Sequence, residues 1–190
     1  LNKMKIGMQW FLLHTGHGAT NHFEAGGFIR SRAGVEHPDL QYHFMPIAIR
    51  YDGKSPVSDH GFQAHVGPMR SKSRGTVRLR STDPRRHPEI DPQYMSHPED
   101  WEEMRAGIRL TRELFEQPAM QEFAAGEIAP GPDATGDADL DAFVAQAAES
   151  AYHPACTCGM GSGPQAVVDG STAVHGVEGL HVVDSSIMPT

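Results

Sequence analysis

The stretch SHPEDWEEMRAGIRLTRELFEQPAM (residues 96–120) decides the fold class, because the hydrophobic pattern changes its period there. Ser96 and Glu99 have the spacing of a capping box, and Pro98 suits the first turn of a helix. The side chains that follow at helical spacing are Trp101, Met104, Ile108, Thr111, Leu114 and Phe115. Pro118 is expected to end or kink this helix.

Four segments before this helix have the composition of β-strands. They span residues 22–31, 40–50, 61–70 and 75–81. The pair Gly26–Gly27 in the first segment predicts a bulge or a close backbone approach, and Pro46 in the second predicts an edge or a bulge. The long connections favour a mainly antiparallel sheet with one solvated face.

A second helix is predicted over residues 137–150, with acidic residues in its first turn. Two short strand-like runs follow at residues 166–168 and 180–184, whereas residues 1–20 are ambiguous between helix and loop. Strands that precede helices along a chain indicate an α+β fold. We therefore expect a mainly antiparallel sheet flanked by helices.

Composition excludes some classes of function. The chain has 190 residues, 38% of them apolar, which suits one domain or one and a half. A formal net charge of −8 argues against a nucleic-acid-binding surface. No apolar run approaches the length of a membrane span, and no signal peptide is visible. Both ends look cut, so we expect a piece of a larger protein.

The stretch AYHPACTCGMG (residues 151–161) carries the sharpest chemical signal. Histidine titrates near neutral pH, and Pro154 favours an extended backbone at His153. A histidine on a stiff loop is suited to act as a general base, but a structural histidine fits the pattern equally well. Cys156 and Cys158 have C-x-C spacing, so we expect two reduced thiols.

The sequence contains other candidate sites. The run GMGSG (residues 159–163) lacks the third glycine and the following helix of a dinucleotide loop, and Ser162 lies in the wrong register for a nucleophile elbow. The 12 histidines include no H-x-x-x-H or H-x-H pair, so a metal site would have to assemble from distant segments. His43 fits core packing, and Glu24 fits either a surface or a site position.

Several motifs together resemble the glucose–methanol–choline (GMC) oxidoreductases, a family of flavin-dependent alcohol oxidases and dehydrogenases. The residues that carry the resemblance are YHPACTCGMG (152–161), AVVDGSTAVHGVEGLHVVDSSIMPT (166–190), GATNHFEAGGFIRSR (18–32), QYHFMPIAI (41–49), GFQAHVGPMRSKSRG (61–75) and YMSHPEDWEEMR (94–105). The resemblance implies that residues 1–150 belong to the substrate-binding domain. Residues 151–190 would then hold the active-site loop and the start of the return to the FAD-binding domain, whose phosphate loop is absent here.

The resemblance also implies roles for individual residues. His153 would face the flavin and take the proton of the substrate hydroxyl, His43 would be a second histidine near the substrate, and Asp184 and Ser185 would lie along the flavin. The aromatic candidates for contact with a quaternary ammonium group are Phe23, Tyr42, Phe44 and Tyr152. The family's other catalytic position would fall after Thr190, and its acidic choline-binding residue upstream of Leu1. The loop departs from the family at Gly159, where lysine is frequent.

The function that the resemblance implies is oxidation of choline, or a similar small alcohol, to betaine aldehyde, with FAD as cofactor and no metal. Electrons would pass to a membrane-linked acceptor, which places the protein in the cytoplasm, peripheral to the inner face of the membrane. The alternatives are another alcohol dehydrogenase of the family, a histidine-liganded metalloprotein and an interaction module without catalysis. The isolated chain, without the flavin domain, is expected to be inactive, and the oligomeric state is open.

Overall fold

The computed structural model describes residues 2–23, 25–49 and 60–189. The chain divides into two compact units. The first comprises Leu1–Met69 and Glu102–Pro132, and the second comprises Arg70–Trp101 and Asp133–Thr190. These bounds differ from the predicted functional division near residue 150, which stays a prediction.

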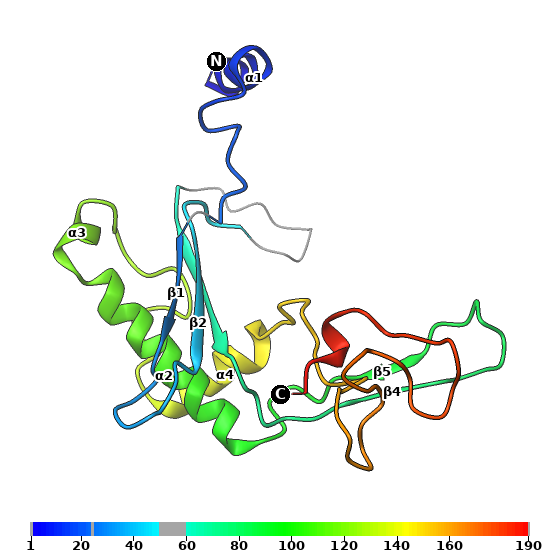
Figure 1. Ribbon diagram of the computed structural model, residues 1–190. Coiled ribbons are helices and arrows are strands. Elements are labelled where there is room, and N and C mark those ends of the chain that lie inside the picture. The colour runs from blue at the N-terminus through cyan, green and yellow to red at the C-terminus, as the bar shows by residue number, and fades with distance from the viewer. Residues whose placement is uncertain (1, 24, 50–59, 190) are drawn as a thin grey trace. The chain divides into compact units, whose positions relative to one another are not determined.

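The first unit holds a three-stranded antiparallel sheet in the order β1-β2-β3 (Figure 1). The strands are β1 (Ala25–Ile29), β2 (Leu40–Met45) and β3 (Gln63–Pro68). The central strand β2 ends immediately before Pro46, which has no N–H to donate to a ladder. Pro46 therefore terminates the strand, and the prediction of an edge or bulge there was wrong.

The close approach predicted at the first glycine pair is confirmed at Gly26. A Cβ atom on this residue would lie 2.7 Å from the carbonyl oxygen of Tyr42 on the neighbouring strand. No bulge interrupts the pairing, which runs continuously from Ala25↔Phe44 to Ile29↔Leu40. Gly26 is thus required because the backbones come too close for a side chain.

The register of the sheet sorts its side chains into two faces. His43 pairs with Gly26 on β1 and with His65 on β3, so these residues share one face. Tyr42 and Phe44 lie on the opposite face, which α2 (Pro98–Phe115) covers. The Tyr42 hydroxyl donates to the carbonyl of Gly107 over 2.9 Å.

Apolar packing joins this second face to the helix. Leu40, Tyr42 and Ile108 are buried. The ring of Phe115 meets the ring of Phe62 edge to face, with 5.0 Å between centroids, and that of Phe44 at 6.4 Å. The long helix predicted from the change of period is therefore confirmed, and its apolar face forms the core of the first unit.

The first and last residues of α2 match the positions predicted from Pro98 and Pro118, whereas the predicted capping box is not formed. The helix begins at Pro98, and the N–H of Glu99 donates to Nδ1 of His97 over 3.3 Å. A capping box at Ser96 would start the helix one residue earlier, so that detail was wrong. The helix ends at Phe115, and a short helix α3 begins at Pro118 (Pro118–Gln121), as expected for a proline stop.

The sequence of residues 1–20 was ambiguous, and its described part, residues 2–20, forms a helix followed by a loop. The helix is α1 (Asn2–Leu13), and its long apolar side chains Met4, Met8, Phe11 and Leu12 are exposed. Trp10 contacts the His14 ring at 5.8 Å between centroids, just past the helix end. The apolar surface of α1 is thus largely uncovered in this chain.

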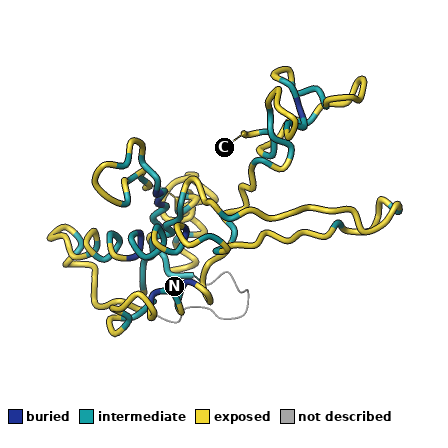
Figure 2. The backbone as a smooth tube through the Cα atoms, turned by 90° about the horizontal axis from the view of Figure 1, so that it is seen from below, coloured by how far each residue is buried: buried dark blue, intermediate teal, exposed yellow. Residues whose placement is uncertain are grey.

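In the second unit, β4 (Thr76–Arg78) pairs antiparallel with β5 (Glu89–Asp91) in a separate two-stranded sheet. The sequence had placed the β4 segment with the other strands, and that assignment was wrong. The strand β5 was not predicted, because the three residues between Pro88 and Pro92 are too few to show an alternating pattern. Figure 2 shows these strands exposed, in yellow.

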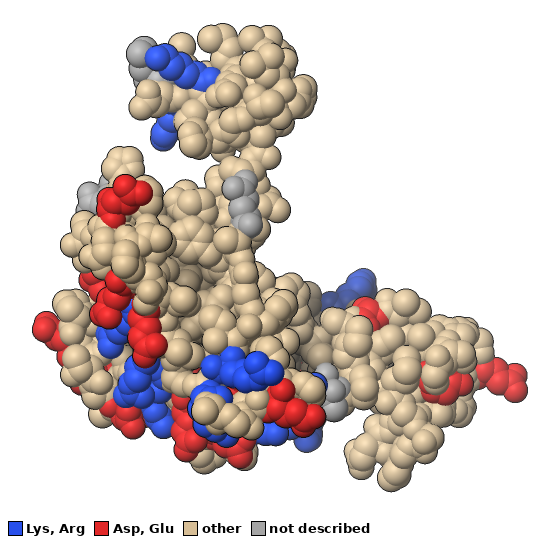
Figure 3. All heavy atoms as spheres, turned by 60° about the vertical axis from the view of Figure 1, so that its left-hand side comes forward, with Lys and Arg blue, Asp and Glu red and all other residues tan. Residues whose placement is uncertain are grey.

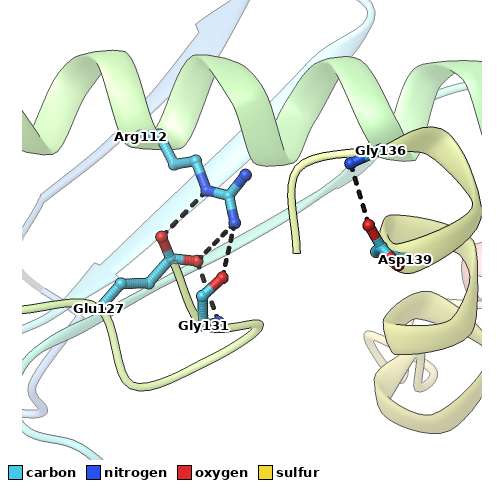
Figure 4. Close-up of polar contacts among 5 residues, drawn as sticks. All are labelled: Arg112, Glu127, Gly131, Gly136 and Asp139. Carbon is cyan, nitrogen blue, oxygen red and sulfur yellow. Dashed lines mark hydrogen bonds and ion pairs between the residues drawn. The ribbon is translucent and has the colours of Figure 1, made fainter. Parts of the chain in front are cut away.

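The predicted second helix is confirmed as α4 (Asp137–Ala147), with Leu140 and Val144 buried. The carboxylate of Asp139 accepts the N–H of Gly136 over 3.1 Å and so satisfies a donor at the start of the helix (Figure 4). With helices and antiparallel sheets in one chain, the predicted α+β class is confirmed.

Two surface properties bear on function. Within the described residues, every helix is too short or too polar to cross a bilayer. In the lower left part of the face shown in Figure 3, Lys and Arg side chains lie among Asp and Glu side chains.

Candidate active site

The loop around His153 has an unusual backbone. Tyr152 and Cys156 have positive φ angles of 61° and 74°, a region that residues other than glycine rarely occupy. They bracket His153 and Pro154, and both Tyr152 and His153 are exposed, the former by 77%. Backbone strain of this kind persists only where the surroundings hold it, and it is frequent at functional sites.

Three hydrogen bonds hold this loop against the end of the chain. The Ser185 hydroxyl donates to the carbonyl of Pro154 over 3.0 Å. The N–H of Cys158 donates to the carbonyl of Ser186 over 2.9 Å, and that of Met160 to the carbonyl of Ile187 over 2.9 Å. The loop and residues 185–187 therefore form one local structure, which brings His153 and Ser185 close together.

Asp184 shapes the segment that anchors the loop. It precedes a single 3₁₀ turn, η1 (Ser185–Ile187), and its carboxylate accepts the N–H of Ser186 over 2.8 Å. Hydrogen bonding from Ser186 lowers the pKa of Asp184 below its ordinary value. This carboxylate is therefore ionised at neutral pH, next to the segment that holds the His153 loop.

The residues between these two segments add further support. The N–H of Gly161 donates to the carbonyl of Val168 over 3.0 Å, and that of Val167 to the carbonyl of Gly159 over 2.9 Å. Val168 is fully buried, and isolated bridges pair it with Met160 and Val174. The two predicted short strands appear here only as such bridges. These bridges nevertheless support the exposed loop from below.

His43, the other predicted catalytic histidine, lies in the first unit. It is half-buried, and the Phe23 ring meets its imidazole edge to face, with 6.0 Å between centroids. Phe23 is itself 47% exposed. The structure thus brings together two predicted site residues, a hydrogen-bonding ring and an accessible aromatic ring, on one side of the sheet.

Tyr42 and Phe44 have a different environment from the substrate contact predicted for them. Tyr42 is 6% exposed and bonds to α2 through its hydroxyl, which also accepts the Thr111 hydroxyl over 3.2 Å. Burial raises the pKa of the Tyr42 phenol. Phe44 packs on Phe115 and Phe62. Both side chains therefore pack in the core, on the face opposite His43.

Two residues that the sequence analysis did not assign share the face of His43. His65 lies directly opposite His43, and the amide nitrogen of Gln63 lies 2.6 Å from Nε2 of His65. Strand alternation placed His65 on one face of its own strand. The pairing of β2 with β3, which a single sequence does not reveal, was needed to place it beside His43.

The remaining candidates add little to the site. Glu24 lies outside the described residues. In the part of the chain that the structure describes, no three His, Cys, Asp or Glu side chains gather to hold a metal ion. Cys156 and Cys158 are free thiols, as expected. The described candidate residues that remain are the imidazole rings of His153 and His43 and the aromatic rings of Phe23 and Tyr152.

Curated proteins of similar sequence point to one enzyme class. Oxygen-dependent choline dehydrogenase of Pseudomonas aeruginosa (strain UCBPP-PA14) is 56% identical over 188 residues, which are 99% of this chain and 34% of that protein. Oxygen-dependent choline dehydrogenase of Yersinia pseudotuberculosis serotype IB (strain PB1/+) is 55% identical over 188 residues, 99% of this chain and 33% of that protein. The chain thus spans about a third of the length of these relatives.

Solved structures share the fold. Pyridoxine 4-oxidase from Mesorbium loti superposes with a TM-score of 0.80 at 26% identity, over 90% of this chain and 34% of its own. Formate oxidase of Aspergillus oryzae RIB40, in a study of FAD modification, gives a TM-score of 0.88 at 22% identity, over 100% of this chain and 38% of its own. At that identity the second likeness shows the fold alone.

The family itself is established by the sequence of the second half of the chain. Residues 71–190 match the family described as GMC oxidoreductase. This match includes the His153 loop and the Asp184 segment that anchors it, and it extends over more than half of the chain. The chain therefore belongs to the GMC oxidoreductase family.

Proposed function

We propose that the complete protein of which this chain is part oxidises choline, or a closely similar small primary alcohol, with FAD as cofactor. The observation that carries the proposal is the exposed His153, held on a strained loop that is bonded to residues 185–187. The identity of 55–56% to enzymes named oxygen-dependent choline dehydrogenase supports choline as the substrate.

The residues around Asp184 fit a flavin. Apolar and aromatic side chains there are open to a flat ring, since Val183 and Tyr152 are both 77% exposed. Asp184 and Ser185 would hold the cofactor mainly through backbone groups that η1 and the Pro154 contact keep in place. When bound, FAD would supply the acceptor for the hydride that leaves the alcohol carbon.

His153 would act as the base for the substrate hydroxyl. Its ring nitrogen would accept the hydroxyl proton as the alcohol is oxidised, and the imidazolium would then stabilise the negative charge that develops on the oxygen. Pro154 and the hydrogen bond from Ser185 fix the backbone beside the ring, so little reorganisation is needed. His43 would contribute a hydrogen bond that orients the substrate.

Aromatic rings would favour the cationic end of choline. A quaternary ammonium group has no N–H and is attracted to the faces of aromatic rings. Phe23 beside His43 and the exposed Tyr152 beside His153 are available for this contact, whereas Tyr42 and Phe44 are packed in the core. Phe23 and Tyr152 therefore remain candidates for the cation site.

Electron transfer and location follow from the same proposal. The electrons would pass from the flavin to a membrane-linked acceptor, which would place the protein in the cytoplasm, peripheral to the inner face of the membrane. The family resemblance supports this acceptor, whereas the relatives' name, oxygen-dependent choline dehydrogenase, favours oxygen instead. Fractionation of cells that produce the complete protein, with and without high-salt washing of the membranes, tests this location.

The decisive experiment uses the complete protein, purified with its flavin and kept anaerobic. Flavin absorbance is followed after choline is added to the wild type, to His153→Ala and to His37→Ala, an exposed control histidine. We expect rapid bleaching in the wild type and the control, and a rate about 10²- to 10⁴-fold lower in His153→Ala.

Each other result has a definite meaning. Bleaching with other alcohols but not with choline would keep the family chemistry and move the substrate. An unchanged rate in His153→Ala would remove the proposed base, and a protein without flavin would overturn the proposal altogether.

A further inference from the structure

The pairing of β2 with β3 sets two histidines side by side. His43 and His65 are direct partners in an antiparallel ladder, so both side chains emerge from the same face, and both are half-buried. Side chains at such positions have Cβ atoms about 4.5–5.5 Å apart. A positive charge on His65 would therefore repel a positive charge on His43 or on a cationic substrate bound next to His43.

The orientation of the Gln63 amide is fixed by a backbone group. The N–H of Ile49 donates over 2.9 Å to the side-chain oxygen of Gln63. A backbone N–H has no acceptor capacity, so the amide must turn its oxygen toward Ile49 and its NH₂ group away. The contact of that NH₂ group with the Met45 sulfur at 3.9 Å agrees with this orientation.

This orientation determines where the proton of His65 lies. The NH₂ group of Gln63 only donates, and it lies 2.6 Å from Nε2 of His65. Nε2 must therefore be the acceptor, which requires a neutral ring with its proton on Nδ1. Protonation of His65 would place two donors against each other and break the contact with Gln63.

We propose that Gln63 and His65 form a tautomer lock beside His43. Gln63 keeps His65 neutral with its proton on Nδ1, and His65 is a positioning residue that acts on the reaction through His43. A neutral neighbour beside His43 avoids repulsion of a cationic substrate. The catalytic part of this inference rests on the proposed function.

The lock itself is tested without turnover, by ¹⁵N NMR of the complete flavoprotein labelled at histidine. The His65 signals are assigned by their loss in His65→Asn. We expect an unprotonated Nε2 and a protonated Nδ1 at neutral pH. In Gln63→Glu, whose carboxylate can only accept, the proton should move to Nε2 or a second proton should appear there. A protonated Nε2 in the wild type would overturn the lock.

The effect on catalysis is tested with two variants of Gln63 in the same protein. Gln63→Glu keeps the size of the side chain and the acceptor for the N–H of Ile49, but it replaces the donor toward His65 with an acceptor. Gln63→Met removes the hydrogen bonds to Ile49 and His65 and places no strong acceptor against His65. If the lock matters, kcat for choline should fall about tenfold in Gln63→Glu and less than threefold in Gln63→Met. A purely structural role of Gln63 predicts the opposite order, which would overturn the positioning role.

Controls separate this inference from the proposed function. Both variants must retain flavin and thermal stability close to the wild type, and kcat is compared with KM because a carboxylate also attracts the choline cation. An uncharged analogue, 3,3-dimethylbutan-1-ol, should show the same order of kcat values. If the wild type oxidises no alcohol, the proposed function fails, while the NMR experiment still decides whether the lock exists.

Discussion

Asp100 shows how a single buried charge can order a segment of the second unit. Its side chain is 1% exposed. It accepts the Ser71 hydroxyl over 2.6 Å, the N–H of Lys72 over 2.7 Å and the N–H of Ser73 over 3.0 Å. Burial raises the pKa of Asp100, but the hydrogen bonds from Ser71, Lys72 and Ser73 outweigh it and hold the pKa below its ordinary value.

Asp100→Asn is therefore expected to destabilise the complete protein by about 1–3 kcal/mol at neutral pH, because the new NH₂ group would face donors. Because the pKa of Asp100 is lower in the folded protein than in the unfolded chain, where it is about 3.9, its carboxylate stabilises the fold above that pH. This stabilisation is lost as pH falls through the pKa of the folded state. The asparagine of the variant cannot titrate, so its free energy of unfolding should lack this contribution to the acid dependence. Urea denaturation from pH 3 to 7 measures both effects, with exposed Asp133→Asn as the control. Equal stability of the two variants would contradict the role of Asp100.

Single residues also show what the sequence can and cannot predict about the site. The position of His153 on a loop rather than a helix followed from the proline after it and the glycines behind it. The roles of Tyr42 and Phe44 did not follow, because alternation along a strand separates two faces without saying which one a helix covers. The contacts of Tyr42 with Gly107 and of Phe44 with Phe115 identify that face.

At the scale of elements, the helix–sheet contact in the first unit depends on a residue without a side chain. Gly107 lies in α2 against β3, and a Cβ atom there would come within 2.9 Å of Cγ2 of Val66. Valine is stiff at χ1, so it cannot turn away easily. The close packing of α2 on the sheet therefore requires glycine at this position.

Gly107→Ala is expected to destabilise the complete protein by about 1 kcal/mol, because overpacking costs about 1–3 kcal/mol and alanine returns about 0.5–1 kcal/mol of helix propensity. The control is Gly126→Ala, at an exposed loop position where a Cβ atom would meet nothing within 4 Å. That variant should be neutral or slightly more stable. Thermal unfolding compares them, and a stabilised Gly107→Ala would show that the helix moves to accept the methyl group.

A second element contact ties α2 to the chain that follows it. Arg112 donates to both carboxylate oxygens of Glu127, at 2.9 and 3.0 Å, and to the carbonyl of Gly131 at 3.1 Å (Figure 4). The two charged side chains are only 23% and 26% exposed. The guanidinium presents donors on two separate nitrogens to these acceptors, a two-point geometry that the single ammonium nitrogen of lysine cannot reproduce.

Arg112→Lys should therefore cost about 1 kcal/mol of stability and raise proteolytic cleavage between residues 122 and 136. Arg85→Lys is the control, because its pair with Asp83 is 89% and 40% exposed and is expected to contribute little. Chemical denaturation and limited proteolysis of the complete protein measure the two effects. Equal changes in both variants would mean that the half-buried geometry adds nothing.

The elements themselves were predicted better than their partners. Hydrophobic period located α2, α4 and the strands of the first sheet to within a few residues, since period is a local property. The separation of β4 from that sheet was not predicted, because strand pairing depends on distant residues such as β5, which is too short to leave a pattern. The same limit hid the pairing of His43 with His65.

At the scale of the whole molecule, several large apolar side chains of the described residues are exposed on both units. Met4 and Phe11 on α1 are 75% and 72% exposed, and Leu79 beside β4 is 91% exposed. Val77 and Ile90 face the same side of the β4–β5 pair, and both are exposed. A two-stranded sheet is marginally stable alone in water, so this face needs a cover.

The chain spans about a third of its relatives' length, and we expect the rest of the complete protein to supply that cover. The isolated 190-residue chain should therefore bind the dye ANS strongly and oxidise no choline, whereas the complete protein should bind much less dye per mole. Leu79→Thr combined with Ile90→Thr should lower dye binding of the isolated chain. Threonine favours strands, so the two changes remove apolar surface without disfavouring the strand conformation.

If the isolated chain bound no more dye than the complete protein, its apolar faces would already be covered, either by the chain itself or by a second copy. Sedimentation would separate those two cases. Turnover of choline by the isolated chain would show that the flavin site does not depend on any further part of the complete protein.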